Sequence, residues 1–145
     1  MNVAFFFTQT GQDEKSIEIY NGLNEEIESG KIDNGSIFYK EPGHIPVEPL
    51  FSMFNSTDIW FYTGTLIATS METFLDAAKA INKYTLAYLF DKKNEHNAFN
   101  LIGIANQSKI LTSNEEDHKE VYRLTGIKPI LLENLKPSTI EKALQ

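Results

Sequence analysis

The sequence contains no cysteine, and this absence removes several classes of function at the outset. Without thiols the chain can form neither disulfides nor zinc–thiolate sites, and it cannot use a cysteine nucleophile. Basic residues are also scarce, since 13 Lys and Arg stand against 20 Asp and Glu and give a net charge of −7. An acidic chain repels phosphate backbones, so we predict that nucleic acid is not a partner.

Long apolar runs are absent as well. No stretch approaches the roughly 18 residues of a membrane helix, and the amino-terminal segment lacks the basic residues of a signal peptide. We therefore expect a cytoplasmic protein without membrane insertion. The 145 residues are 41% hydrophobic and 23% charged, which is typical of a folded domain and argues against disorder. Linkers and repeats are missing, so the sequence predicts a single domain over residues 1–145.

Strand patterns recur along the whole chain. Short apolar or aromatic runs bounded by polar turns predict six strands, at residues 3–7, 36–39, 59–62, 84–90, 109–112 and 130–132. Polar loops follow these runs at residues 8–12, 41–45, 63–69, 91–96, 113–116 and 133–137. The strands are apolar on both faces, which is typical of a parallel sheet covered by helices.

Helical patterns alternate with the strands. Asp13 is a candidate cap for a helix whose apolar stripe ends before Ser29-Gly30, and residues 47–54 carry apolar side chains at helical spacing. Capping boxes are expected at Thr69 with Glu72, at Ser113 with Glu116 and at Ser138 with Glu141. The helix after Thr69 should bury one face, made of Met71, Phe74, Leu75, Ala78 and Ile81.

This alternation predicts an α/β fold, a three-layer Rossmann-like sandwich of about six mostly parallel strands with helices on both faces. Residues from the strands and from the inner faces of the helices should form its core. The expected core residues are Val3, Phe5, Phe51, Ile59, Phe61, Phe74, Ala78, Leu86, Tyr88, Ile110, Leu111 and Leu124.

Ligands of an open parallel sheet bind beyond the carboxyl ends of its strands. We therefore take the polar residues of the loops after the predicted strands as candidates for ligand binding. They are Thr8, Gln9, Thr10, Gln12, Gly64, Thr65, Asp91, His96, Ser113, Asn114 and Glu116.

Established catalytic and cofactor motifs are missing from these loops. The chain has no G-x-G-x-x-G, no P-loop and no G-x-S-x-G elbow, and its histidines at positions 44, 96 and 118 are not spaced for metal ligation. We therefore expect no cofactor and no metal. A capping role explains Glu72 without any catalysis, although a carboxylate at a helix start could also act as a nucleophile.

One stretch resembles a known family. Residues 104–117 read IANQSKILTSNEED and residues 122–130 read YRLTGIKPI. They are similar to the end of the amino-terminal domain of GT-B glycosyltransferases, where a strand and helix of the type A-D-x-I-[LI]-T-x-S precede a strand of the type P-I-x-x-I-x-N. The motif covers about 25 residues, and the order of elements is similar over most of the chain.

This resemblance implies a function on the acceptor side of a transferase. In the family a carboxy-terminal domain holds most of the nucleotide-sugar donor, and neither that domain nor its paired-Glu motif is present in these residues. The amino-terminal half mostly recognises the acceptor, with a polar residue after the fourth strand, for which Asp91 and His96 are the nearest matches. The resemblance thus implies a binding domain for a sugar or nucleotide that is not independently catalytic. A second glycosyltransferase subunit, or further copies of the chain, would be its partners.

Two other interpretations stay open. A nucleoside 2-deoxyribosyltransferase-like N-glycosidase would use Glu72 as its nucleophile, although the family's G-x-x-x-E-[LI]-G-Y-A signature is absent around that residue. A non-enzymatic homo-oligomer is the other interpretation, because 10 Phe, 6 Tyr and 1 Trp could supply an apolar interface.

Overall fold

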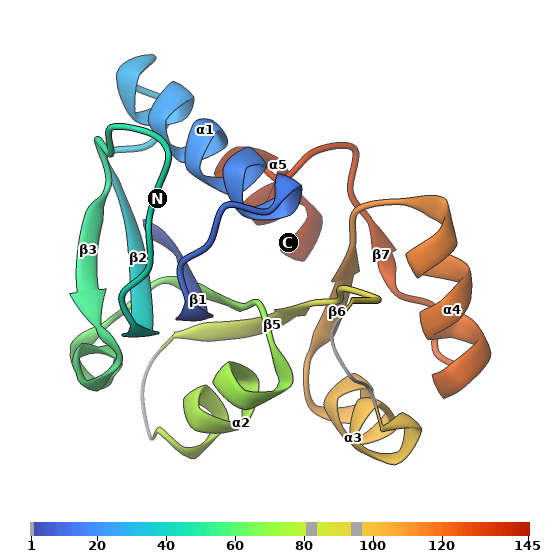
Figure 1. The fold of residues 1–145 in the computed structure, drawn as a ribbon. Coiled ribbons are helices and arrows are strands. Elements are labelled where there is room, and N and C mark those ends of the chain that lie inside the picture. Colours follow the sequence, from blue (N-terminus) through green and yellow to red (C-terminus); the bar gives the residue numbers. More distant parts are fainter. Residues whose placement is uncertain (1, 81–83, 94–96) are drawn as a thin grey trace.

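The computed structural model describes residues 2–80, 84–93 and 97–145 as alternating strands and helices (Figure 1). In chain order these elements are β1 (Asn2–Gln9), α1 (Glu14–Glu28), β2 (Asn34–Glu41), β3 (Ser52–Asn55), the 3₁₀ helix η1 (Ser56–Phe61), β4 (Thr65–Ala68), α2 (Met71–Lys79), β5 (Thr85–Leu89), α3 (Ala98–Gln107), β6 (Lys109–Thr112), α4 (Glu115–Thr125), β7 (Ile130–Leu131) and α5 (Pro137–Leu144).

All seven strands lie in one sheet, in the order β3-β2-β1-β4-β5-β6-β7, and every neighbouring pair is parallel. The chain moves outward from β1 to β3, returns to β4 beside β1, and then moves outward again to β7. The strand order therefore reverses between β1 and β4, where Phe6 of β1 aligns with Ala68 of β4. Loops diverge from such a switch point and leave a crevice at the carboxyl ends of the two strands.

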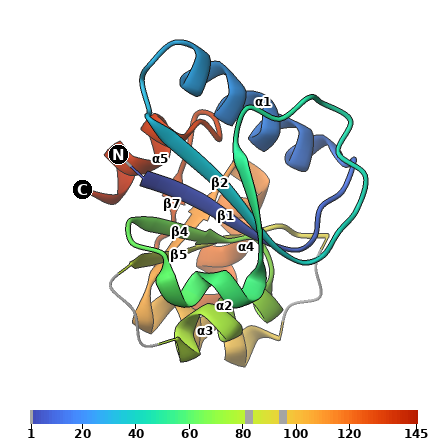
Figure 2. The same cartoon turned by 90° about the vertical axis from the view of Figure 1, so that its left-hand side faces the viewer.

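Helices cover both faces of the sheet, as Figures 1 and 2 show, with α1 and α5 on one side and α2 and α3 on the other. Residues 3–7 of β1 are all buried because the strand lies in the middle of the sheet. Its odd-numbered residues pack with α1 and α5, whereas Ala4 and Phe6 pack with η1, β4 and α2. The predicted three-layer Rossmann-like sandwich is thus confirmed, with seven strands in place of about six.

The region between residues 47 and 68 differs from its prediction. The expected helix over residues 47–54 is wrong, because Pro49 lacks an amide hydrogen and residues 52–55 form the edge strand β3. The expected strand over residues 59–62 is wrong too. It lies mostly in η1, which Asn55 caps by accepting a 3.1 Å hydrogen bond from the Thr57 amide. The central strand is β4, whose four residues are all buried between β1 and β5.

The predicted capping boxes are wrong in detail. The box of α2 joins Ser70 to Thr73, one residue beyond the expected Thr69–Glu72 pair. Asn114, not Ser113, caps α4, by accepting a 2.8 Å hydrogen bond from the Asp117 amide. No side chain at the N-cap position caps α5, which begins at a proline. A short polar residue on either side of a helix start can serve as the cap, so spacing alone left these positions ambiguous.

Most of the expected core is buried, with four exceptions. Phe61 is 86% exposed because it ends η1 instead of lying in a strand. Ala78 is exposed, since Phe74 and Ala77 form the buried face of α2, and Leu86 and Leu124 are half-buried. On the expected stripe of α2, Leu75 is also exposed, and Ile81 lies outside the described residues. In the part of the chain that the structure describes, no helix has the length and apolarity needed to cross a membrane.

Candidate functional site

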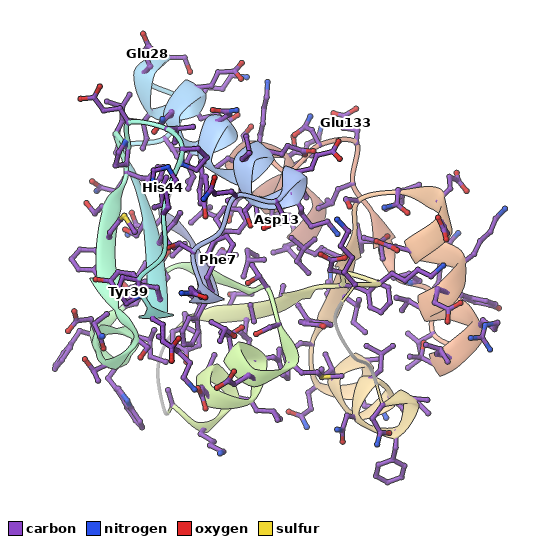
Figure 3. All side chains as sticks on the ribbon, in the orientation of Figure 1. Phe7, Asp13, Glu28, Tyr39, His44 and Glu133 are labelled. Carbon is purple, nitrogen blue, oxygen red and sulfur yellow. The ribbon has the colours of Figure 1, made fainter. Side chains whose placement is uncertain are left out.

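A cavity of about 180 Å³ lies at the switch point, where β1, β4 and β5 end. Figure 3 labels Phe7 on β1 and Asp13 at the start of α1, and both side chains belong to its wall. The polar lining is supplied by Thr8, Gln9, Asp13, Lys15, Ser16, Thr69, Ser70 and Asp91. The crevice that the strand order predicts is therefore present and polar.

Hydroxyl groups line the β1–β4 side of this cavity. The Thr8 and Ser70 hydroxyl oxygens lie 2.9 Å apart, and Ser70 also accepts the Thr73 amide hydrogen at 3.2 Å as the cap of α2. Thr69 donates its hydroxyl hydrogen to the Phe6 carbonyl oxygen at 2.9 Å. These bonds fix the hydroxyl oxygens in place, and an ordered hydroxyl retains capacity for a further hydrogen bond to a ligand.

Lys15 occupies the β5 side of the same cavity. Its ammonium nitrogen lies 3.7 Å from a carboxylate oxygen of Asp91 and 3.7 Å from one of Asp117, and it donates to the Phe90 carbonyl oxygen at 3.3 Å. Asp117 is buried, and it also accepts a 3.2 Å hydrogen bond from the Asn114 side-chain amide. Lys15 thereby connects the start of α1 to the end of β5 and to the first turn of α4.

A wider cavity of about 470 Å³ adjoins the first and shares Lys15 and Asp91 with it. Its lining includes five carboxylates and three lysines, together with Ser113 and Asn114. Lys92 and Glu116 form an ion pair at its rim, and the hydrogen bond to Glu116 raises the pKa of Lys92. Carboxylates outnumber ammonium groups, so the cleft formed by the two cavities has a negative balance of charge.

Three helices, α1, α2 and α4, begin beside the cleft, and the residue that precedes each of them caps it with its side chain. Asp13 accepts the Ser16 amide hydrogen in α1, Ser70 accepts that of Thr73 in α2, and Asn114 accepts that of Asp117 in α4. The amide at the third helical position, a common contact for bound anions, is therefore already occupied in all three helices. Together with the negative balance of charge, this arrangement disfavours phosphate groups.

The structure brings several predicted residues together. Thr8, Gln9 and Asp91 line the first cavity, and Asp91, Ser113, Asn114 and Glu116 line the second.

Thr10 and Gln12 line neither of the two cavities. Thr10 is buried, and its hydroxyl accepts the Gly43 amide hydrogen at 2.9 Å, so it holds the loop after β2 in place. Gln12 is exposed in the loop before α1, and the predicted residue His96 lies outside the described residues.

Gly64 and Thr65 lie at the amino end of β4, whereas the cleft lies at the carboxyl ends of the strands. Their expected place beyond the carboxyl end of a strand is therefore wrong. They precede and begin β4 instead of following a strand, and the Thr65 hydroxyl donates to Glu141 at 2.8 Å. Gly64 has a φ of +134°, and a Cβ at that position would lie 2.6 Å from the Asn2 carbonyl oxygen. The glycine therefore serves the turn into β4.

Sequence reasoning did not identify Lys15, Ser70 and Asp117 as site residues. A signal for Lys15 existed, because it lies in the first turn after the β1 loop, at the ligand-binding edge. Among the described residues, no three His, Asp or Glu side chains are grouped as a metal site. Neither a family model, nor a curated protein, nor a solved structure matches the chain.

Proposed function

We propose that this domain binds a neutral, hydroxyl-rich ligand of the sugar class, as the acceptor-side domain of a GT-B-type glycosyltransferase, and that these 145 residues do not catalyse transfer alone. One observation carries the proposal. The cleft at the switch point combines hydroxyls, carboxylates and lysines, and its three helix starts are capped by the chain's own side chains.

The lining matches the hydrogen-bonding needs of a sugar. Each sugar hydroxyl donates one hydrogen bond, which the carboxylates of Asp91 and Glu116 can accept, and it accepts bonds from donors such as the Lys15 ammonium group. The wider cavity, about 470 Å³, falls within the range of about 300–1,000 Å³ that is usual for small-molecule sites. A nucleotide would instead bring phosphate charge into a negative cleft.

The segment that resembles the GT-B family leads into this cleft. It runs from the end of α3 through β6 into α4, and it places Ser113 and Asn114 in the lining of the wider cavity. Asp91, which the resemblance suggests as a cleft residue, is shared by both cavities. These positions support an acceptor-side function, because the stretch that carries the resemblance contributes Ser113, Asn114, Glu116 and Asp117 to the lining of the wider cavity.

The test is a thermal-shift screen with neutral mono- and oligosaccharides, nucleosides, nucleotides and nucleotide-sugars, followed by calorimetric titration of any hit. A ligand at 100 times its dissociation constant stabilises the fold by about 2.7 kcal/mol, which a thermal shift detects. We expect stabilisation by a neutral saccharide and none by nucleotides.

Asp91→Asn keeps the size of the side chain but removes its charge, so it should weaken saccharide binding by about tenfold, the equivalent of one charge-assisted hydrogen bond. Asp33→Asn is the matched control, because Asp33 is exposed in the turn between α1 and β2 and lines neither cavity. Preferential binding of nucleotides, or hydrolysis of a UDP- or GDP-sugar by the pure protein, would refute the proposal.

A further inference from the structure

A second, separate depression of about 400 Å³ lies over β2, β3 and η1, and it shares no lining residue with the cleft. Its lining consists of four aromatic side chains and one carboxylate, namely Phe38, Phe54, Phe61, Tyr62 and Asp58. An apolar, aromatic lining with one polar group is typical of small-molecule sites, and here every apolar member is aromatic.

Three of these rings are in mutual contact through Phe38. Phe38 is buried, and its ring centroid lies 5.6 Å from that of Phe54 and 5.4 Å from that of Tyr62. The interplanar angles are 31° and 70°, so the three rings present differently oriented surfaces. The Tyr62 hydroxyl donates to the Thr65 carbonyl oxygen at 3.2 Å, which fixes its ring relative to β4. The arrangement of Phe38, Phe54 and Tyr62 is therefore fixed by contacts within the domain.

Two of the lining rings are more exposed than packing within the domain explains. Phe61 is 86% exposed and Phe54 is 40% exposed, so both rings leave apolar surface in water. Asp58 is exposed as well, and within the described ranges its carboxylate makes no hydrogen bond or ion pair. A negative charge without a partner thus lies beside apolar rings that are only partly covered.

We propose that this aromatic cage, defined by Phe38, Phe54, Asp58, Phe61 and Tyr62, binds a quaternary ammonium group. A cation is attracted to the negative face of each ring, and the Asp58 carboxylate adds a direct charge attraction. The net charge of −7 favours cations over the whole surface. The N-methyl groups supply apolar contact with the rings.

The same lining disfavours a primary ammonium group. Such a group has three N–H donors, and Asp58 is the single ionised acceptor among the lining side chains. Burial against the rings would leave donors without partners, which costs free energy. A trimethylammonium group carries the same charge without any N–H donor, so it suits the cage better.

Titration with choline and with its neutral isostere 3,3-dimethyl-1-butanol tests the proposal. Binding is followed by amide NMR shifts and by the fluorescence of Trp60, the single tryptophan, which neighbours Phe61 in η1. We expect saturable binding of choline, with the isostere bound about tenfold more weakly because it lacks the charge. Equal binding of the two, or no saturable binding of choline, would overturn the proposal.

Two variants locate the site. Phe61→Ala and Asp58→Asn each change an exposed side chain, so both should fold, and each should weaken choline binding by at least about threefold. Phe99→Ala is the matched control, since Phe99 is 82% exposed on α3 and lies outside the cage. Choline binding that survives both cage variants, or that Phe99→Ala weakens equally, would contradict the assignment.

A further arm separates a soluble ligand from a lipid headgroup, because both carry the same chemistry. Sedimentation with phosphatidylcholine vesicles that free choline reverses would identify the headgroup as the source. Choline binding without vesicle sedimentation would identify a soluble quaternary ammonium ligand, and both results support the cage. Sedimentation that choline fails to reverse, and that Phe61→Ala leaves unchanged, would refute it.

Discussion

Glu26 of α1 holds the first turn of α5 through Ser138, 112 residues later in the chain. The buried Glu26 carboxylate accepts the Ser138 amide hydrogen at 2.7 Å with one oxygen and the Ser138 hydroxyl hydrogen with the other. Because α5 begins at Pro137 without a side-chain cap of its own, Glu26 supplies the negative charge that a helix start favours. The last helix is thereby tied to the first on one face of the sheet.

Replacing Glu26 should therefore destabilise the fold. Glu26→Ala leaves the Ser138 amide without its charged partner, and we expect a loss of about 1.5–3 kcal/mol in the free energy of unfolding. The neighbouring Glu25 is a matched control, since it pairs with Lys136 at 3.0 Å while remaining mostly exposed. Glu25→Ala should cost less than about 1 kcal/mol. Urea unfolding measures both values, and equal losses would contradict the buried role of Glu26.

Phe74 tests the packing on the other face of the sheet, which α2 covers (Figure 1). Its ring is buried and packs edge-on against Tyr88, with centroids 6.0 Å apart at 73°. Phe74→Ala should cost roughly 3–5 kcal/mol, because it leaves a cavity between α2 and β5. Leu75→Ala, at a neighbouring position that is 48% exposed, should cost less than about 1 kcal/mol. A loss below about 1 kcal/mol for Phe74→Ala would show that this face of α2 is not part of the core.

The fold class could be predicted from those segments of the sequence in which hydrophobic burial alone decides the secondary structure. Residues 3–7 and 109–112 are short buried runs, and both form strands as predicted. Prediction failed where two runs competed, at residues 59–62 and 65–68. The aromatic run Ile59-Trp60-Phe61-Tyr62 has the higher strand propensity, but it is Thr65-Leu66-Ile67-Ala68 that pairs with both β1 and β5. Pairing with neighbouring strands decides which of the two runs joins the sheet, and the local sequence pattern does not show that pairing.

The sequence predicted the edge of the sheet at which the candidate site lies, but it did not predict the contacts between the residues of the site. Asp91 and Asn114 follow strands directly, so topology alone placed them near the cleft. Lys15 and Asp117 come from helices and meet across 3.7 Å, a distance that depends on how α1 and α4 pack on the sheet. Sequence periodicity carries no information on that packing, because both residues are also plausible as solvated helix positions.

Lys40 of β2 offers a test of the ion pairs between that strand and α2. Its ammonium nitrogen lies 2.7 Å from Asp76 and 2.7 Å from Glu72, and the hydrogen bond to Asp76, followed by that to Glu72, raises the pKa of Lys40 above 10.5. A raised pKa means that the stabilisation is complete below pH 10.5 and is lost as the pH rises through the raised value. Asp76→Asn should lower the pKa of Lys40 more than Glu72→Gln. An NMR titration of the Lys40 side chain measures both, and the reverse order would contradict the assignment.

Glu72 separates the proposed binding function from the alternative N-glycosidase. Its carboxylate pairs with Lys40 and accepts a 3.4 Å hydrogen bond from the hydroxyl of Thr8, which lines the first cavity. As an exposed partner of Lys40, it should contribute less than about 1 kcal/mol, and Glu72→Gln should leave saccharide binding intact.

As a nucleophile, Glu72 would be essential for release of the base from a deoxynucleoside, and Glu72→Gln would abolish that reaction. Asp76→Asn is the matched control, because it removes the other carboxylate on Lys40 without touching Thr8. Chromatography of the freed base measures the activity. We expect no release from the wild-type chain or from either variant. Release by the wild type that survives Asp76→Asn and disappears in Glu72→Gln would instead assign the N-glycosidase reaction to this cleft.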